Sequence, residues 1–386
     1  MSLAVDTNIL VDALNRNSDV HEQARSFLDT LASRTDVVIT ELPGWCRIRA
    51  MKYGSVELHN VCGILQGDGK PGIGISRLPL DTLPAINSGA AAMALMGTGC
   101  EIRGVLGSGG EARITLQATD SNTTPPVVTV YHGCFCGQSV IAERKPTEIV
   151  IKTPERIDAM AVIGREQDHP FDPLLVRVRL PPIHSVRILS IEGDLAYPEA
   201  GTTPTRTLLC YGSSITHGAC AIAPEGTYAA QCARRLGFDL INLGFGGSAH
   251  MDCPIAEHIA ARGDWDIATL EMGINVRMWP LARFCEAVQR FVGTIAAAHR
   301  DKHVFCIDLF PYFDDFVTQR ATAVGFREAV RAIVAAIGSD RVHYIDGRDL
   351  LVNASGLRTD VVHPNDEGMQ EMGQNLADVI GRLRTF

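Results

Sequence analysis

Thr205-Arg-Thr-Leu-Leu-Cys-Tyr-Gly-Ser-Ser-Ile-Thr-His-Gly218 is the stretch that decides the fold of the second half of the chain. Its apolar run at 208–211 predicts a short buried strand, and Gly212 ends that run. Serines that come directly after such a strand lie at the carboxyl edge of a sheet, where open α/β proteins bind their ligands. A Gly-Ser-Ser sequence is also common in ordinary loops, so this turn by itself does not establish a chemistry.

Three further blocks occur in order at the ends of expected strands. Asn242-Leu-Gly-Phe-Gly-Gly247 closes an apolar run, a later strand ends in Gly273-Ile-Asn275, and Asp360-Val-Val-His363 precedes the last expected helix. Together with the Ser213-Ser214 turn, these blocks resemble the SGNH (GDSL-type) hydrolase family, which uses Ser, Gly, Asn and an Asp-x-x-His pair. The resemblance covers residues 205–386.

The resemblance implies a role for each block. Ser214, the third residue of its Gly-x-Ser, is expected to be the nucleophile, and His363 the general base and then the acid for the leaving alcohol. Asp360 would fix the tautomer of His363, although this pair also suits the ordinary start of a helix. The oxyanion hole would use the backbone N–H groups of Ser214 and Gly247 and the side-chain amide of Asn275.

The first block departs from the family pattern at one position. The family usually has Gly-Asp-Ser, whereas this chain has Gly-Ser-Ser, so Ser213 stands in place of the aspartate. The resemblance assigns that aspartate to the hydrogen bonding of the turn. The departure therefore concerns the geometry of the turn, and it leaves Ser213 as the alternative nucleophile.

Four further residues are candidates for contact with a substrate. His217 and His250 come just after two of the blocks, and they are interpreted either as pocket residues or as solvated loop histidines. Arg277 and Trp279 come after the Asn block and should rim the site, with the tryptophan either stacking on a sugar or aromatic group or packing beneath the loop. Two aspartates that end later strands without belonging to a block are interpreted as structural: Asp308 and Asp346.

Residues 46–196 are expected to form a jelly-roll-like β-sandwich. Apolar and polar residues alternate along 111–119 and 176–180, as in half-buried antiparallel strands. Further strands are expected at 127–131, 147–152, 159–163 and 186–191, with Gly, Pro and Asn clusters between them. The Leu58-His-Asn60 and Arg77-Leu-Pro79 pieces fit the SGNH enzymes that carry such a domain, including some carbohydrate esterases and a polyketide-tailoring acyltransferase.

Residues 197–386 are expected to form a flavodoxin-like three-layer α/β/α catalytic domain. The Pro- and Gly-rich segment 197–205 is interpreted as the linker. After it, apolar runs and amphipathic patterns alternate, which predicts a parallel sheet covered by helices on both faces. The expected strands are 206–211, 238–243, 266–272, 302–309 and 341–346, and the expected helices are 226–236, 253–262, 281–299, 321–338 and 365–384.

Residues 1–45 differ from the rest of the chain. A strand, an amphipathic helix and a second strand resemble the opening of a PIN-domain nuclease of the VapC toxin type, with Asp6 and Glu41 at its first two acidic positions. Such nucleases hold a divalent cation with several carboxylates, and the stretch that supplies the others is missing. We interpret residues 1–45 as a truncated fragment, with an RNA-cleaving toxin as the alternative that rests on this fragment alone.

The composition excludes several classes of partner. A net charge of -9 argues against nucleic acid and anionic membranes, and no apolar run is long enough to cross a bilayer. The 11 scattered cysteines favour a reducing cytoplasm, and Cys134-Phe-Cys136 lacks the second pair that a zinc site needs. We expect no metal and no cofactor.

The sequence therefore predicts a serine esterase that removes a short acyl group, with acetyl expected first, from a hydroxylated small molecule such as a sugar. Two alternatives remain open. One is an acyltransferase that uses the same acyl-enzyme, and the other is a carbohydrate- or ligand-binding protein with a decayed catalytic domain.

Overall fold

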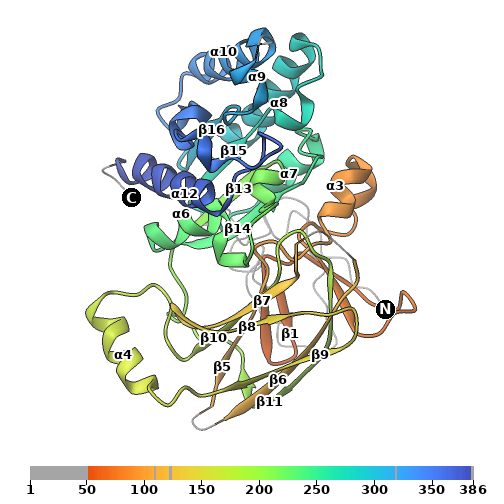
Figure 1. Cartoon of the computed structure of the whole chain (residues 1–386), viewed down its shortest axis with the longest axis vertical. Coiled ribbons are helices and arrows are strands. Elements are labelled where there is room, and N and C mark those ends of the chain that lie inside the picture. The colour runs from red at the N-terminus through yellow and green to blue at the C-terminus, as the bar shows by residue number, and fades with distance from the viewer. Residues whose placement is uncertain (1–50, 108–109, 121–123, 318–319, 384–386) are drawn as a thin grey trace, which may run out of the picture. The chain divides into compact units, whose positions relative to one another are not determined.

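The computed structural model describes residues 51–386 except 108–109, 121–123, 318–319 and 384–386 (Figure 1). Residues Ile48–Ala260 and Asp264–Phe386 form one compact unit. The PIN-like fragment at 1–45 lies outside the described residues, so its interpretation stays a prediction. Within the described part of the chain, no helix combines the length and the apolar character needed to span a membrane.

The first half of the described chain is a sandwich of two antiparallel sheets, as expected. Buried side chains from both sheets, such as Leu58 and Ile114, share one apolar core. The alternation of β6 places Ala112, Ile114 and Leu116 inside that core. One sheet has the order β1 (Met51–Tyr53), β2 (Val56–His59), β5 (Glu101–Leu106), β10 (Leu175–Arg179), β7 (Val127–His132) and β8 (Phe135–Ile141), with β12 (Leu195–Ala196) beside β5. The other has β3 (Gly63–Leu65), β4 (Ile73–Ser76), β11 (Val186–Gly193), β6 (Glu111–Ala118) and β9 (Thr147–Lys152).

One expected strand of the sandwich is wrong. Residues 159–163 belong to helix α4 (Ile157–Glu166) and pair with no strand among the described residues. The sheltered residues of α4 recur at the spacing of a helix, at Ile157, Met160, Ala161 and Gly164. A short apolar run does not distinguish a strand from one turn of an amphipathic helix, which explains the error.

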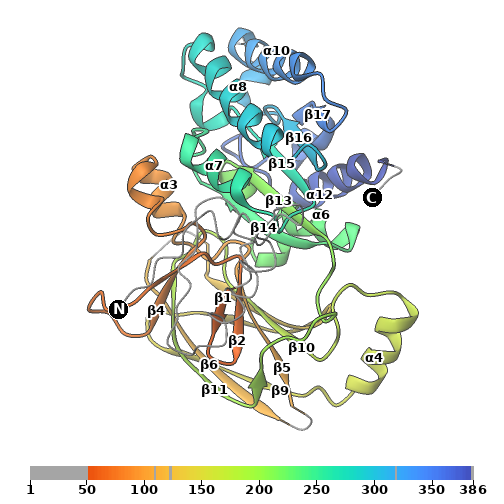
Figure 2. The same ribbon diagram turned by 180° about the vertical axis from the view of Figure 1, so that it is seen from behind.

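The second half is a three-layer α/β/α domain, which confirms the expected fold. Its sheet has five parallel strands in the order β14 (Asp239–Gly244), β13 (Thr207–Gly212), β15 (Ile267–Glu271), β16 (His303–Ile307) and β17 (Val342–Ile345). In chain order this is 2-1-3-4-5, the flavodoxin-like arrangement. Helices α6 (Tyr228–Leu236) and α12 (Asp366–Gly381) pack on one face, and α7 (Cys253–Ala261), α8 (Leu281–Ala298) and α10 (Arg320–Ile337) belong to the other layer (Figure 2).

The sandwich contacts the edge strand β14 through buried polar groups. The Arg103 guanidinium donates to both carboxylate oxygens of Asp239, each at 2.7 Å. His59 Nε2 lies 2.6 Å from the Leu240 carbonyl oxygen. Buried polar groups are stable only when they are paired, so these contacts fix the sandwich to the strand that leads into the Gly247 block.

Candidate active site

Ser214 stands at the first turn after the central strand β13. It begins the short helix α5 (Ser214–His217), and its Oγ lies 2.8 Å from His363 Nε2. Ser213 is buried, and its Oγ accepts from the Ile215 N–H at 3.2 Å, so it caps the turn. Of the two serines, Ser214 is the one that the structure brings to His363.

Asp360 and His363 share one loop before α12. His363 Nδ1 lies 2.7 Å from Asp360 Oδ2, and Asp360 Oδ1 accepts from the N–H groups of Val362 and His363, each at 3.0 Å. Partial burial raises the pKa of Asp360, but the donors from His363 and Val362 outweigh it and lower the pKa below its ordinary value. The carboxylate therefore holds the proton on Nδ1, and the lone pair of Nε2 faces the Ser214 hydroxyl.

Gly247 and Asn275 lie on neighbouring loops beside Ser214. A Cβ added to Gly246 would meet Ser214 Cβ at 3.7 Å, which places this loop against the serine. Gly247 is exposed and has φ +68°, a conformation that suits glycine. Asn275 Oδ1 accepts from the Ala249 N–H at 3.1 Å, which links the two loops and leaves the amide hydrogens as donors.

Comparisons with known proteins agree with this geometry. The family model described as GDSL-like Lipase/Acylhydrolase matches residues 210–371, the segment that carries all of these groups. The chain contains a GDSL-like lipase/acylhydrolase domain. A comparison with curated protein sequences gave no match.

Solved structures share the fold of both halves of the chain. Salicylyl-acyltransferase SsfX3 from a tetracycline biosynthetic pathway is similar with a TM-score of 0.71 and 18% identity, over 88% of this chain and 97% of that chain. A protein named as a GDSL-like lipase from Bacteroides ovatus gives 0.63 and 18%, over 85% and 97%. A family two carbohydrate esterase from Clostridium thermocellum, solved with cellohexaose, gives 0.54 and 14%, over 74% and 93%. At these identities the likeness establishes the fold alone.

Arg77 reaches the loop of the GDSL-like domain from the sandwich, a role that sequence reasoning did not assign to it. Its fully buried guanidinium donates to the carbonyl oxygens of Asn242 and Gly244, each at 2.9 Å, just before the Gly246-Gly247 turn. It also donates to Met93 O at 2.7 Å. Burial lowers the pKa of Arg77 to about 10, so it remains charged at neutral pH.

His217 lies between Arg77 and the Gly246-Gly247 turn. Its Nδ1 accepts from the Gly246 N–H at 3.2 Å, and its Nε2 lies 3.2 Å from Arg77 Nη2. Burial and the Arg77 charge hold the pKa of His217 well below its ordinary value, so the ring is neutral. Since its exposed fraction is 0%, both interpretations of His217 are wrong: it is not a solvated loop histidine, and it presents no surface to a substrate. The ring contacts the loop from within the core.

A second support from the sandwich lies on the other side of the same loop. Asn87 caps helix α3 (Ser88–Met93), which Figures 1 and 2 show beside α7, and its Nδ2 donates to Ser248 O at 3.0 Å. The same amide nitrogen donates to Asp252 Oδ2 at 2.7 Å. A Cβ on Gly89 would meet Ser248 Oγ at 2.1 Å, so α3 approaches the loop as closely as glycine allows.

Glu271 is a further residue that sequence reasoning missed. It is buried at the end of β15, and its Oε2 accepts from the Ser213 N–H at 2.5 Å and from Thr216 Oγ1 at 3.1 Å. Burial raises the pKa of Glu271. Where the family has an aspartate within the turn, this chain brings a carboxyl group to the turn from the neighbouring strand. The signal in the sequence that could have revealed Glu271 is a strand that ends in Glu shortly before the Gly-x-Asn block.

The expected rim residues occupy different places. His250 and Trp279 line an open cavity of about 620 Å³, together with residues such as Asn87 and Arg283. The Arg283 guanidinium lies 3.8 Å from the centre of the Trp279 ring, and the His250 ring centre is 5.7 Å away. Trp279 thus packs against these two side chains. Arg277 contacts Phe313 instead and is not a wall of this cavity.

The two aspartates interpreted as structural also have protein partners. Asp308 accepts from Tyr344 Oη at 2.5 Å and from the Gly347 N–H at 2.7 Å. Asp346 pairs with the Arg348 guanidinium at 2.6 Å.

Proposed function

We propose that this protein is a serine esterase that hydrolyses short-chain esters, acetyl esters first, of a hydroxylated small molecule. The observation that carries this proposal is the hydrogen-bonded series Ser214 Oγ, His363 Nε2, His363 Nδ1 and Asp360, with distances of 2.8 and 2.7 Å. A nucleophile, a base and an orienting carboxylate in this order support acyl transfer. The match to an acylhydrolase family model supports a hydrolase in the same way.

The reaction would proceed in two acyl-transfer steps. Ser214 Oγ bonds to the ester carbonyl carbon while its proton passes to His363 Nε2. The oxyanion is held by the N–H groups of Ser214 and Gly247 and by Asn275 Nδ2. When the carbon–oxygen bond breaks, the leaving alkoxide takes the proton from His363. Water then gives one proton to His363 and attacks the carbonyl carbon of the acyl-enzyme. When the bond from that carbon to Ser214 Oγ breaks, Oγ takes the proton back from His363 and the carboxylic acid is released.

Arg77, His217 and Asn87 would act as positioning residues in this reaction. They bond to Gly244, Gly246 and Ser248, which flank the proposed oxyanion donor Gly247. Glu271 would do the same for the serine turn through the Ser213 N–H. Preorganised donors act best when they do not have to move during the reaction, which is the advantage of such supports.

The first experiment concerns the nucleophile. A fluorophosphonate probe should label the wild-type chain on Ser214, and Ser214→Ala should lose labelling and p-nitrophenyl acetate hydrolysis together. Ser213→Ala is the matched control, because its hydroxyl caps the turn and should leave labelling in place. Loss of activity in Ser213→Ala with retention in Ser214→Ala would reverse the assignment. Absence of both labelling and turnover in the wild type would favour a binding protein.

The substrate is tested by a chain-length series of p-nitrophenyl esters, with and without added alcohols or acetylated sugars. The carbohydrate esterase with the similar fold supports a sugar ester, and the similar SsfX3 supports an acyltransferase as the second candidate. We expect a preference for acetate with water as acceptor. Preference for octanoate would overturn the short-acyl proposal, and transfer mainly to an added alcohol would favour the acyltransferase.

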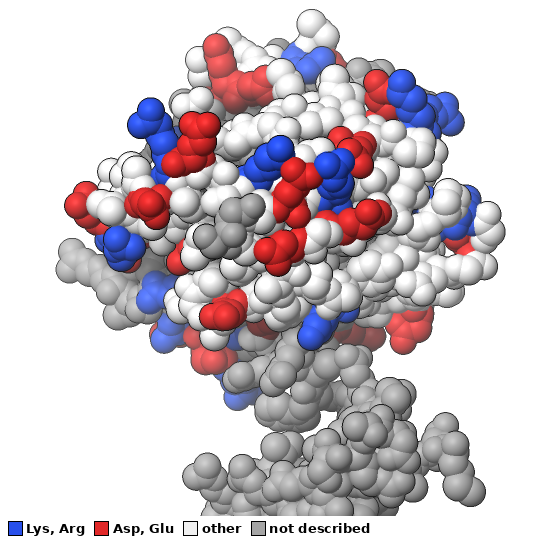
Figure 3. Space-filling view, turned by 90° about the horizontal axis from the view of Figure 1, so that it is seen from below, with Lys and Arg blue, Asp and Glu red and all other residues white. Residues whose placement is uncertain are grey.

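We also propose a small-molecule partner and a cytoplasmic location. Figure 3 shows acidic and basic side chains interspersed over one face, with no continuous basic surface there, which supports a small-molecule partner over nucleic acid. The cysteines in the described part of the chain are free thiols, which supports a reducing cytoplasm.

A further inference from the structure

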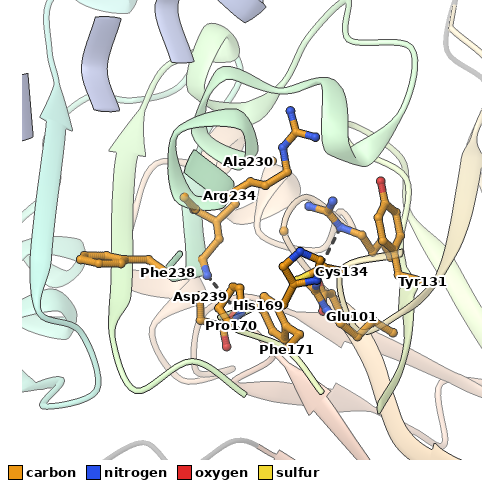
Figure 4. A pocket seen from close by; sticks show the side chains of 15 residues that line it. Glu101, Tyr131, Cys134, His169, Pro170, Phe171, Ala230, Arg234, Phe238 and Asp239 are labelled. Atoms are coloured by element: carbon orange, nitrogen blue, oxygen red, sulfur yellow. Dashed lines mark hydrogen bonds and ion pairs between the residues drawn. The ribbon is translucent and has the colours of Figure 1, made fainter. Parts of the chain in front are cut away.

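A second cavity, of about 300 Å³, lies between the sandwich and the GDSL-like domain (Figure 4). Its walls include Asp239 and Leu240 at the start of β14, whereas the proposed oxyanion loop comes after the end of that strand. Five steps along a strand span about 16 Å. The cavity is therefore at the opposite edge of the sheet from Ser214, and it is separate from the proposed catalytic site.

Three arginines meet at Glu101 beside this cavity, and one of them, Arg103, also pairs with Asp239 and Glu57. Glu101 accepts from Arg103 Nε at 2.8 Å and from Arg177 Nη2 at 2.6 Å, and Arg179 Nε forms an ion pair with it at 3.2 Å. Burial raises the pKa of Glu101, but these guanidinium groups outweigh it and hold the pKa well below its ordinary value. Asp239 is already engaged by both terminal nitrogens of Arg103. One carboxylate is thus shared among three cations.

Arg179 is the cation with donors to spare. Its Nε pairs with Glu101, but its two terminal nitrogens meet no acceptor within the described residues. The guanidinium lies 5.5 Å from the centre of the Tyr131 ring, and only 12% of the side chain is exposed. Arg234 at the exposed rim adds a second positive charge, and its hydrogen bond is to the neutral Gln231 at 2.9 Å. A sheltered guanidinium with a free planar pair of donors matches a carboxylate.

His169 supplies an independent sign of a missing partner. Its Nδ1 is buried and has no hydrogen-bond partner among the described residues, while Nε2 lies 3.3 Å from Gln167 Oε1. If Nε2 donates to Gln167, Nδ1 is an unused acceptor at the cavity wall. Figure 4 shows Tyr131, His169 and Phe171 on the sandwich side of the cavity, opposite Arg234. An orphaned acceptor between aromatic rings fits a flat ligand that carries a donor.

We propose that this cavity binds a small aromatic carboxylate that carries a hydrogen-bond donor on its ring. The carboxylate pairs with the terminal nitrogens of Arg179, the ring lies among Tyr131, His169 and Phe171, and the donor meets His169 Nδ1. Cavities of this volume are at the lower limit of small-molecule sites, which restricts the ligand to a single ring. This inference does not depend on the proposed esterase activity.

The test is isothermal titration calorimetry of the full chain with 4-aminobenzoate, benzoate and benzamide at constant ionic strength. A hydrogen bond to a charged group is stronger than one between neutral groups, so we expect Arg179→Gln to weaken 4-aminobenzoate binding about tenfold or more. Arg113→Gln on β6 is the matched control, since it removes an arginine with two carboxylate partners outside this cavity and should leave binding unchanged. Benzamide, which lacks the charge, should bind at least as weakly as 4-aminobenzoate binds to Arg179→Gln.

Two further measurements keep the result unambiguous. His169→Phe should remove the preference for 4-aminobenzoate over benzoate, and Arg234→Gln at the exposed rim replaces Arg179→Gln if that variant does not fold. Protein treated with the fluorophosphonate should bind 4-aminobenzoate as untreated protein does. No binding to the folded wild type, equal binding to Arg179→Gln and wild type, or loss of binding after fluorophosphonate labelling would overturn the proposal. The first two outcomes would leave the arginine cluster as a purely structural link.

Discussion

The boundary between the β-sandwich and the GDSL-like domain and the interior of the GDSL-like domain both bury carboxylates, but the groups around these carboxylates differ. Where the sandwich meets β14, Asp239 faces Arg103, and although burial raises the pKa of Asp239, the guanidinium outweighs this and lowers it to about 2. Inside the GDSL-like domain, Asp308 and Glu271 accept mainly from N–H and hydroxyl groups, and burial raises both pKa values. The first carboxylate is stable as an anion, and the other two bind a proton more readily.

The groups proposed to react and the arginines that support their surroundings also come from different domains. The groups proposed to react, Ser214, His363 and Asp360, all come from the GDSL-like domain. The guanidinium groups of the sandwich contact the strand and the loop that precede Gly247, through Arg103 and Arg77. We therefore infer that the sandwich supports the proposed site and is more than an appended binding module. Substitutions on either side of the boundary should therefore differ in the size and kind of their effects.

The largest effect should come from the reacting side, at Asp360. Asp360→Asn keeps the shape but no longer accepts from His363 Nδ1 as an anion, so the wrong tautomer is favoured. In serine hydrolases with this relay the corresponding change lowers kcat about 10⁴-fold, and we expect a similar loss in p-nitrophenyl acetate hydrolysis. Asp346→Asn, which removes a carboxylate paired with Arg348, is the control. A loss below about tenfold would show that the relay in the structure is not the one that reacts.

The next effect should come from Asn275. Asn275→Ala removes a proposed oxyanion donor and the acceptor for the Ala249 N–H, so we expect kcat to fall about 10²–10³-fold. Asn275→Asp, which retains the acceptor for Ala249 and loses the donor, separates the two contributions. If Asn275→Asp kept full activity, the residue would support the loop without binding the oxyanion.

The sequence determined most of the reacting side and little of the supporting side. Alternating strands and helices predicted the parallel sheet, and the blocks predicted which loops meet at its carboxyl edge. The contact between Arg77 and His217 joins residues 140 positions apart, one after strand β4 of the sandwich and one in helix α5, so no local pattern reports it. Helix α4 was missed for the opposite reason, because a single short apolar run fits two periodicities.

The carboxylate at the boundary with the sandwich and the one inside the GDSL-like domain should make stability respond to pH in opposite directions. Burial raises the pKa of Asp308 to about 6 from an ordinary 3.8. As pH rises from about 4 to 6, the unfolded chain releases this proton first, so the native state loses up to about 3 kcal/mol. Urea unfolding should show that Asp308→Asn removes this loss. Asp239, with its pKa near 2, instead contributes stability above about pH 4 that disappears on acidification, and Asp239→Asn should remove that contribution. If Asp308→Asn and Asp239→Asn changed the pH dependence of stability in the same direction, the proposed difference between the two carboxylates would be wrong.

The smallest effect concerns the support that the sandwich gives to the loop. Arg77→Lys keeps the charge, but one ammonium group cannot replace the separate donors that meet Asn242 O, Gly244 O and Met93 O. The oxyanion loop should then shift, and since small misplacements near a reacting centre cost up to about 10²-fold, we expect kcat to fall about 10–100-fold with KM little changed. Arg113→Lys, on strand β6 of the sandwich, is the control.

A loss of folding in Arg77→Lys would leave a second route to the same question. His217→Gln can still accept from the Gly246 N–H, whereas His217→Ala cannot, so kcat should be retained better in His217→Gln although both variants lose the ring. Equal kcat values in these two variants, or an unchanged kcat in folded Arg77→Lys, would reduce the sandwich to a neighbour of the site. A larger fall in kcat for His217→Ala than for His217→Gln, with KM unchanged, would instead mean that the sandwich holds the oxyanion loop through Arg77 and His217. A folding defect alone would lower the amount of active protein in both variants and would not favour His217→Gln over His217→Ala.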